Sequence, residues 1–266
     1  VQGLAGIGGE HDPFGLGRIE VANWHMRGLT TFYQCDSEAA QRTCESALER
    51  AKTVGNRRAE MVAASSLADV LCMRADWARL EAVSDRCVEL ARDLGAPRFK
   101  LGAVGFRGFA AAQRGRPAEG LGSVEAAVDA CRDLAMTFAG PCLLGFLAAL
   151  TDDPSRRDDA LAEAEELLEY DCVSHNYLVF YPFSMLIRLE DRRPDEVRRY
   201  ANALLAYTSE EPLPWSTFFA DWADTLLEHL DGNADIDQLR QLRERVAETG
   251  LAIVSPPVDD ALRQLA

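Results

Sequence analysis

The segments AKTVG (residues 51–55), ARDLG (91–95) and CRDLA (131–135) recur with starting positions 40 residues apart. Two columns of small residues keep the same interval. The first column is Gly28, Ala68, Gly108 and Ala148, and the second is Ala47, Cys87 and Ala127. A repeat of roughly 20 to 50 residues is typical of stacked supersecondary units that form a solenoid and present a long surface to another molecule.

The units are predicted to be helical. Apolar residues recur at helical spacing in almost every segment, and no segment alternates with the period of a strand. Breaks rich in Gly, Pro and Asp separate helices that pair as 18–34 with 37–54, 57–74 with 77–94, 98–114 with 117–134, 139–150 with 155–170, 176–191 with 194–209, and 214–230 with 234–249. The 40-residue register slips after Tyr170. We therefore predict an all-α fold, a right-handed superhelical solenoid of about six antiparallel helix pairs.

Three regions are expected along the chain. Residues 1–17 are glycine-rich and form an irregular leader, and residues 18–254 form the repeat domain. Residues 255–266 form a tail in which 258–265 adds a short capping helix. The first column of small residues is expected to mark the point where the two helices of each pair cross, because a close approach needs small side chains.

Charge and composition exclude several functions. The net charge of −15 and the pI of about 4.7 disfavour nucleic acids and anionic membrane surfaces as partners. The sequence shows no signal peptide and no apolar run of the ~18 residues that a membrane span needs. Seven cysteines without a CxxC spacing are expected to be small core residues of a reduced cytoplasmic protein, not disulfides or a metal site.

The charged residues are expected to support the helices. Arginine pairs near helix starts and turns are predicted to bridge acidic residues of adjacent units: Arg57-Arg58, Arg156-Arg157, Arg192-Arg193 and Arg198-Arg199. An acidic run is predicted to serve helix-terminus electrostatics and a solvated face: Asp152, Asp153, Asp158, Asp159, Glu163, Glu165, Glu166 and Glu169. Asp153 before Pro154 has the pattern of an N-cap.

The arrangement resembles the tetratricopeptide repeat (TPR). In that repeat a bulky apolar residue precedes a small one by one turn, as Trp24 precedes Gly28, and two alanines stand seven residues apart in the second helix, as Ala40 and Ala47 do. The sequence departs from the family in its unit length, which is 40 residues instead of 34. The proline that follows the second helix in the family is also absent at the matching sites Lys52 and Arg92.

Three segments carry a narrower resemblance. They resemble the C-terminal TPR region of bacterial signalling proteins that combine a class III adenylyl cyclase with an AAA or STAND ATPase. The segments are residues 17–23 leading to 55–61, residues 172–176 and residues 211–215. This resemblance implies a regulatory domain that binds protein or peptide, including other domains of the same chain. A free-standing TPR adaptor remains an alternative.

The sequence carries no signature of catalysis. It has no GxxxxGK[ST] phosphate loop and no HExxH motif, and its histidines His11, His25, His175 and His229 lie far apart. We therefore expect a non-enzymatic chain without cofactor or metal.

Two groups of residues are candidate binding sites. The first is a concave groove lined by the first helix of each unit and suited to an amphipathic helix. Its predicted residues are His25, Leu29, Phe32, Tyr33, Ser65, Asp69, Met73, Phe109 and Gln113. The second is a pocket near residues 172–222 for a small molecule or peptide, with His175, Tyr177, Tyr181, Trp215 and Trp222. For the aromatic residues of both groups the alternative is packing in the core.

Overall fold

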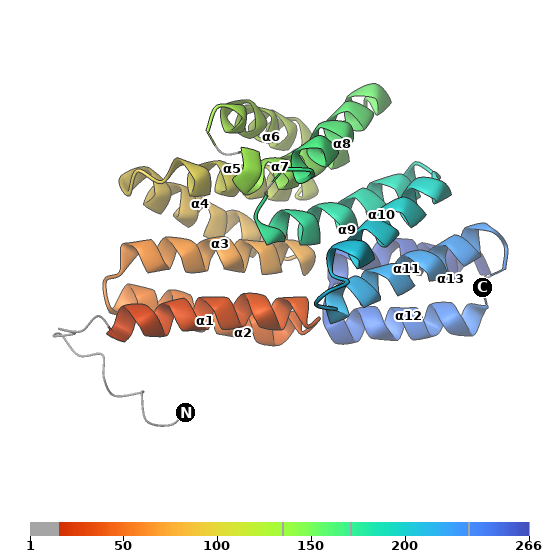
Figure 1. Cartoon of the computed structure of the whole chain (residues 1–266), viewed down its shortest axis with the longest axis horizontal. Coiled ribbons are helices and arrows are strands. Elements are labelled where there is room, and N and C mark those ends of the chain that lie inside the picture. Colours follow the sequence, from red (N-terminus) through yellow and green to blue (C-terminus); the bar gives the residue numbers. More distant parts are fainter. Residues whose placement is uncertain (1–15, 135, 171, 234, 266) are drawn as a thin grey trace.

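The computed structural model describes residues 16–134, 136–170, 172–233 and 235–265, and within α1 it leaves out the side chains of residues 16–22 and 25. The described residues form helices joined by turns, and none of them lies in a strand (Figure 1). The helices are α1 (Leu16–Tyr33), α2 (Ser37–Thr53), α3 (Arg57–Met73), α4 (Trp77–Asp93), α5 (Pro97–Gln113), α6 (Pro117–Arg132), α7 (Met136–Leu150), α8 (Pro154–Leu168), α9 (Ser174–Glu190), α10 (Pro194–Tyr207), α11 (Pro214–Leu230), α12 (Ile236–Thr249), the short 3-10 helix η1 (Ala252–Val254) and α13 (Ser255–Leu265). The predicted all-α solenoid of six helix pairs is confirmed, and α13 follows the sixth pair.

One turn geometry repeats every 20 residues over the first half of the chain. A residue with positive φ ends each helix: Cys35, Gly55, Ala75, Gly95 and Gly115. The amide that follows it donates back to the carbonyl five residues earlier, as in Asn56 to Ala51 at 2.9 Å and Ala96 to Ala91 at 2.8 Å. This is the Schellman motif, which satisfies the last carbonyls of the helix. The 40-residue sequence period therefore contains two helices joined by equivalent turns.

The residue after each positive-φ position also begins the next helix. Asp36, Asn56 and Asp76 accept a hydrogen bond from the backbone three residues on, at 2.9, 3.1 and 3.4 Å. In the next two turns Pro97 and Pro117 occupy the first helical position instead, where the missing N–H costs nothing. A three-residue turn thus ends one helix and begins the next, which fixes the length of each unit.

The small-residue column lies where paired helices cross, as predicted. A Cβ atom at Gly28 in α1 would lie 2.5 Å from the Cys44 sulfur in α2, and one at Gly108 in α5 would lie 2.9 Å from the Gly120 carbonyl in α6. Ala68 and Ala148 are buried at the corresponding places. Glycine is needed at these two points because the facing backbone or side chain occupies the space of a methyl group.

The crossing of α5 and α6 gives a stability prediction with an internal control. A methyl group at Gly120 would lie 2.5 Å from the Gly108 carbonyl oxygen and 2.6 Å from Ala112 Cβ, whereas one at Gly122 in the same helix meets nothing within 4 Å. We expect Gly120→Ala to cost about 2–3 kcal/mol through overpacking. Gly122→Ala should gain up to about 1 kcal/mol, because alanine is the better helix former. Urea unfolding of both variants measures this, and equal midpoints would show that the two helices are not in close contact at Gly120.

The first helix of each pair lies inside the solenoid and the second lies outside. Helices α3, α5, α7, α9 and α11 bury eight to eleven residues each, whereas α2, α4 and α12 bury three to six. Aromatic rings join the inner helices: Phe109 stacks on Phe146 at 4.7 Å, and Phe183 lies edge-on to both. The hydrophobic core consequently runs along the inner helices from one unit to the next.

The first unit contacts the sixth. Phe32 at the end of α1 lies 4.8 Å from Trp215 at the start of α11, between ring centroids. The Ser37 hydroxyl donates to the Thr249 carbonyl at 2.6 Å and accepts from Arg74 at 2.8 Å. Figure 1 shows the end of α1 and the start of α2 next to the start of α11 and the end of α12. The superhelix therefore closes on itself, with residues more than 200 positions apart in direct contact.

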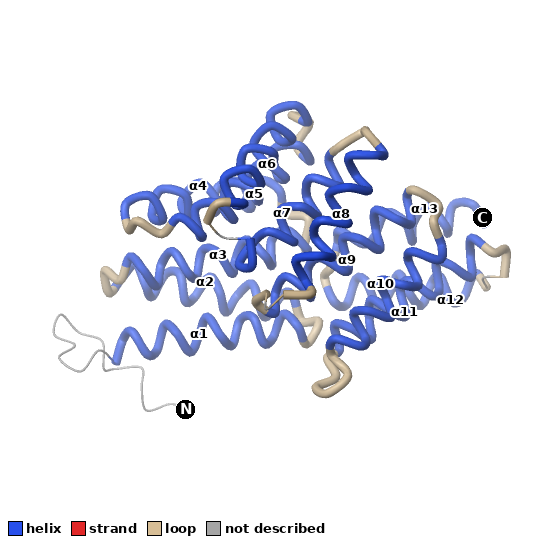
Figure 2. Tube along the Cα trace, turned by 45° about the horizontal axis from the view of Figure 1, so that its top comes forward, coloured by secondary structure: helices blue, strands red, loops and turns tan. Residues whose placement is uncertain are grey.

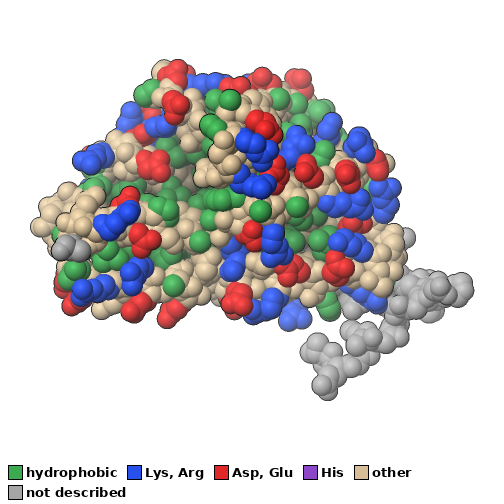
Figure 3. Space-filling model, turned by 180° about the vertical axis from the view of Figure 1, so that it is seen from behind, with side chains coloured by type: hydrophobic (Ala, Val, Ile, Leu, Met, Phe, Trp, Pro, Cys, Tyr) green, Lys and Arg blue, Asp and Glu red, His purple; other side chains and the backbone are tan. Residues whose placement is uncertain are grey.

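Ion pairs connect neighbouring units on the outside. Figure 3 shows Lys and Arg side chains interspersed with Asp and Glu over one whole face. Pairs between successive units include Arg79–Glu45, Arg132–Glu163, Arg156–Glu125, Arg193–Asp158, Arg198–Asp231 and Arg199–Glu165. The predicted bridging between units is confirmed for Arg156, Arg193, Arg198 and Arg199, whereas Arg57 binds Asp93 within its own unit. Because the partners are largely exposed, each pair contributes about 0–1 kcal/mol.

Several sequence expectations need correction. Helix α1 begins at Leu16, inside the expected leader, and the rest of that leader lies outside the described residues. Helix α13 begins at Ser255 and not at 258, because Pro256 and Pro257 fall in its first turn, where proline is tolerated. Asp153 caps α8 as expected, but Glu165 is not part of a solvated face, since Arg199 donates two hydrogen bonds to it at 2.7 and 2.9 Å.

The cysteines are all free, and six of the seven are buried, in agreement with a packing role. No helix in the described part of the chain combines the length and the hydrophobicity needed to cross a membrane.

Candidate functional site

The predicted groove residues divide into a buried set and an accessible set. Phe32, Met73 and Phe109 are fully buried and pack against neighbouring helices, which is the packing alternative that the sequence left open. A second set keeps partial exposure on α1 and α3: Leu29, Tyr33, Ser65 and Asp69. Gln113 is exposed at the end of α5, and the side chain of His25 lies outside the described residues.

The predicted pocket residues lie mainly in the core. Trp215 and Trp222 are fully buried, and their indole nitrogens donate to the carbonyls of Leu178 at 2.8 Å and Val254 at 3.2 Å. His175 lies against Phe138, with its Nε2 atom 3.0 Å from the Phe138 carbonyl, and burial lowers its pKa. The two tryptophans therefore link helices, and the structure does not bring them together with Tyr177 and Tyr181 in one open pocket.

Exposed aromatic side chains gather where the repeat becomes irregular. Tyr170 is 68% exposed and Tyr207 is 40% exposed. The Tyr177 ring stacks on Tyr207 with centroids 4.1 Å apart, and its hydroxyl donates to the carbonyls of Leu168 and Tyr170. In Figure 2 the turns between α8 and α9 and between α10 and α11 are drawn in tan.

The neighbouring turn extends this surface. The Val173 amide donates to the Thr137 carbonyl at 3.2 Å, so the α8–α9 turn lies beside the start of α7. Leu134, just before α7, is 60% exposed, and Val173 is 40% exposed. We call this surface the tyrosine edge and define it as Leu134, Tyr170, Val173, Tyr177 and Tyr207. It holds four of the eight large exposed apolar side chains in the described residues, which is a concentration typical of an interaction surface.

Carboxylates accompany the tyrosine edge in the same turns. Asp133, Glu169, Glu210 and Glu211 are exposed and form no ion pair within the described structure. By contrast, many carboxylates on the outer helices pair with arginine. The edge therefore combines tyrosine rings with uncompensated negative charge, an arrangement that favours a basic partner.

The sequence predicted Tyr177 in this region but missed the other members of the edge. A signal was present in the lengths of the turns. The turns 54–56 and 94–96 are short and follow the regular pattern, whereas 169–173 and 208–213 are longer. The added residues leave Tyr170 outside the helical packing. The loss of the 40-residue register after Tyr170 is therefore the sequence signal that indicates this surface.

Helices α1 and α3 also bring Tyr33 within reach of the charge of Asp69. Burial raises the pKa of Asp69 from 3.8 to about 7. Burial also raises the pKa of Tyr33 well above its usual value, and the nearby Asp69 charge adds to the shift. The Tyr33 hydroxyl is buried and makes no hydrogen bond.

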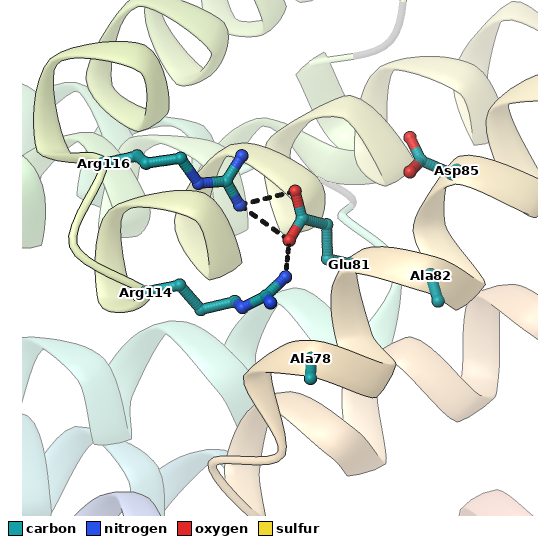
Figure 4. Close-up of a pocket in the computed structure, with 6 residues that line it drawn as sticks. All are labelled: Ala78, Glu81, Ala82, Asp85, Arg114 and Arg116. Atoms are coloured by element: carbon teal, nitrogen blue, oxygen red, sulfur yellow. Dashed lines mark hydrogen bonds and ion pairs between the residues drawn. The ribbon is translucent and has the colours of Figure 1, made fainter.

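An open notch between α4 and the α5–α6 turn is internally neutralised (Figure 4). The Glu81 carboxylate accepts hydrogen bonds from Arg114 and from Arg116, the latter at 2.6 and 2.7 Å. These two arginines lower the pKa of Glu81. Asp85 at its rim binds Arg107 at 3.3 Å. Because its charges already have partners, we interpret the notch as a contact that fixes α4 against the next unit.

Comparison of the sequence with models of known protein families and with curated proteins finds no match.

Proposed function

We propose that this chain is a non-catalytic repeat domain that binds a basic protein segment at its tyrosine edge. The observation that carries the proposal is the gathering of Tyr170, Tyr177 and Tyr207 in the open, next to carboxylates without ion pairs. Tyrosine is enriched where binding energy concentrates in protein interfaces. Lysine and arginine side chains bind both to aromatic faces and to carboxylates.

The closure of the solenoid supports this choice of surface. Phe32 and Phe109 are predicted groove contacts, but both side chains are buried between helices. The tyrosine edge needs no rearrangement of the core to receive a partner. Interfaces of pre-organised proteins usually form with little backbone movement. The tyrosine edge therefore binds its partner in the conformation described above.

The biological role in this proposal is regulation within a larger signalling protein. It rests on the resemblance to the TPR regions of adenylyl cyclase and ATPase proteins, and the partner is then another domain of the same protein or a separate protein. Binding shifts the activity of the catalytic part only as far as it favours one of its states. An in-frame cyclase or P-loop domain in the complete gene supports this role, whereas a gene without one favours the free-standing adaptor.

The surface itself is tested by capture of partners with matched variants. The wild-type chain is compared with Tyr170→Ser/Tyr207→Ser and with the control Leu230→Ser/Leu265→Ser, which removes two exposed apolar side chains elsewhere. We expect the edge variant to lose the captured protein and the control to keep it. A protein that both variants retain equally contradicts binding at the tyrosine edge.

A further inference from the structure

Four tyrosine rings form a row along α9 and α10. The Tyr207 ring stacks on Tyr177, with centroids 4.1 Å apart and an angle of 7° between the ring planes. Tyr181 continues the row at 6.5 Å from Tyr177, and Tyr200 lies 6.3 Å beyond Tyr181, again between ring centroids. Tyr200 is fully buried, whereas Tyr207 is 40% exposed. The row therefore runs from the protein interior to the tyrosine edge.

The Tyr200 end of the row already holds an arginine. The Arg199 guanidinium lies over the Tyr200 ring, 4.3 Å from its centroid. The same group donates two hydrogen bonds to the Glu165 carboxylate at 2.7 and 2.9 Å, and the Tyr200 hydroxyl donates to that carboxylate as well. A planar guanidinium can stack on a ring and pair with a carboxylate in two hydrogen bonds, which the point charge of a lysine ammonium cannot do.

The Tyr207 end has the same kinds of group. Tyr177 covers one face of the Tyr207 ring, so the exposed surface of Tyr207 comes from its opposite face and its edge. Glu210 and Glu211 follow three and four residues later, are exposed, and form no ion pair within the described structure. Because at most about 14 Å of extended chain separates them from Tyr207, the ring and the carboxylates belong to one turn.

We propose that the tyrosine edge binds an arginine side chain of its protein partner and selects arginine over lysine. The guanidinium stacks on the open face of Tyr207 and pairs with Glu210 or Glu211, as Arg199 does at the other end of the row. Stacking separates the two cations, because a guanidinium is planar and weakly hydrated, whereas an ammonium is strongly hydrated. This inference rests on the proposed function and names the side chain that the basic segment supplies.

Fluorescence anisotropy of labelled peptides titrated with the full chain at pH 7 tests the proposal. The short peptides alternate glycine with arginine, with lysine, or with citrulline, which is planar like arginine but uncharged. Two variants change the ring, Tyr207→Leu and Tyr207→Phe. Because Tyr207 is the last residue of α10 and is exposed, both should fold.

A further variant and its control change the charge. Glu210→Gln/Glu211→Gln removes both carboxylates of the turn. The control Asp152→Asn/Asp159→Asn removes two exposed carboxylates at the start of α8, at the opposite end of that helix from Tyr170.

We expect the wild type to bind the arginine peptide at least about threefold more tightly than the lysine peptide, and not to bind the citrulline peptide. Tyr207→Leu should abolish this preference, since leucine has no ring face, whereas Tyr207→Phe should keep it. Glu210→Gln/Glu211→Gln should weaken the binding of both basic peptides, and the control should bind both as the wild type does.

Two kinds of result separate this inference from the proposed function. Equal affinity for the arginine and lysine peptides, or a preference that persists in Tyr207→Leu, overturns the selection of arginine and leaves a basic segment as the partner. If neither basic peptide binds, or if Glu210→Gln/Glu211→Gln binds both as tightly as the wild type, the proposed function fails as well.

Discussion

Asp69→Asn is expected to stabilise the protein at pH 8 and to leave its stability almost unchanged at pH 4. Burial raises the pKa of Asp69 from 3.8 to about 7, so the folded state binds a proton more tightly than the unfolded state does. The contribution of Asp69 to the stability of the wild type must then fall as the pH rises from about 4 to about 7, with no further loss from this residue above that window. Three pKa units correspond to about 4 kcal/mol, which is the upper limit for the gain that asparagine gives at pH 8.

The neighbouring titratable groups do not change their charge in this pH range. Burial raises the pKa values of Cys44 and Cys87 to about 12, and that of Tyr33 is well above 10, so these groups stay neutral between pH 4 and 8. Urea unfolding of the wild type and Asp69→Asn at several pH values measures the difference. Asp159→Asn serves as the control and should follow the wild type. A gain that does not depend on pH would contradict a carboxylate with a raised pKa.

Trp215→Ala is expected to cost about 4 kcal/mol, in the range of large aromatic truncations in cores. The Trp215 side chain is fully buried, donates to the Leu178 carbonyl at 2.8 Å, and contacts Phe32, Tyr33 and Phe219. Its removal takes away the aromatic contact between the first and sixth units. Chemical unfolding measures the loss in stability.

A second tryptophan in α11 separates loss of closure from general loss of stability. Trp222 is also fully buried, but its indole donates to the Val254 carbonyl, within the C-terminal part of the chain. Hydrogen exchange should show that Trp215→Ala exposes the end of α1 and the start of α2, whereas Trp222→Ala leaves their protection unchanged. The same exchange pattern in both variants would mean that Trp215 does not hold the two units together.

The sequence predicts the fold well because each helix carries its own start and stop signals. Asp36, Asn56 and Asp76 cap three helices, and Pro154 and Pro194 occupy first turns, so most predicted bounds lie within about three residues of those observed. The predicted start of the last helix at 258 is three residues late, because Pro256 and Pro257 form the first turn of α13.

The candidate site was predictable only in part. The helical periodicity predicts Tyr33 and Asp69 as accessible residues of the first helices, and both keep partial exposure in α1 and α3. It did not reveal that Ser37 contacts Thr249, since closure depends on small rotations accumulated over six units. For the same reason the periodicity predicts Phe32 and Phe109 as groove residues, although side chains of later units cover them. The tyrosine edge was missed because it arises where the repeat stops being regular.

Hydrogen exchange of the wild-type chain, alone and with a protein captured by it, tests most directly whether the tyrosine edge is the binding surface. We expect the partner to slow exchange in residues 133–137, 168–177 and 205–213, and to leave residues 228–232 and 260–265 unchanged. Slower exchange confined to the outer faces of α2, α4 and α6, with none in the three segments of the edge, would contradict the account.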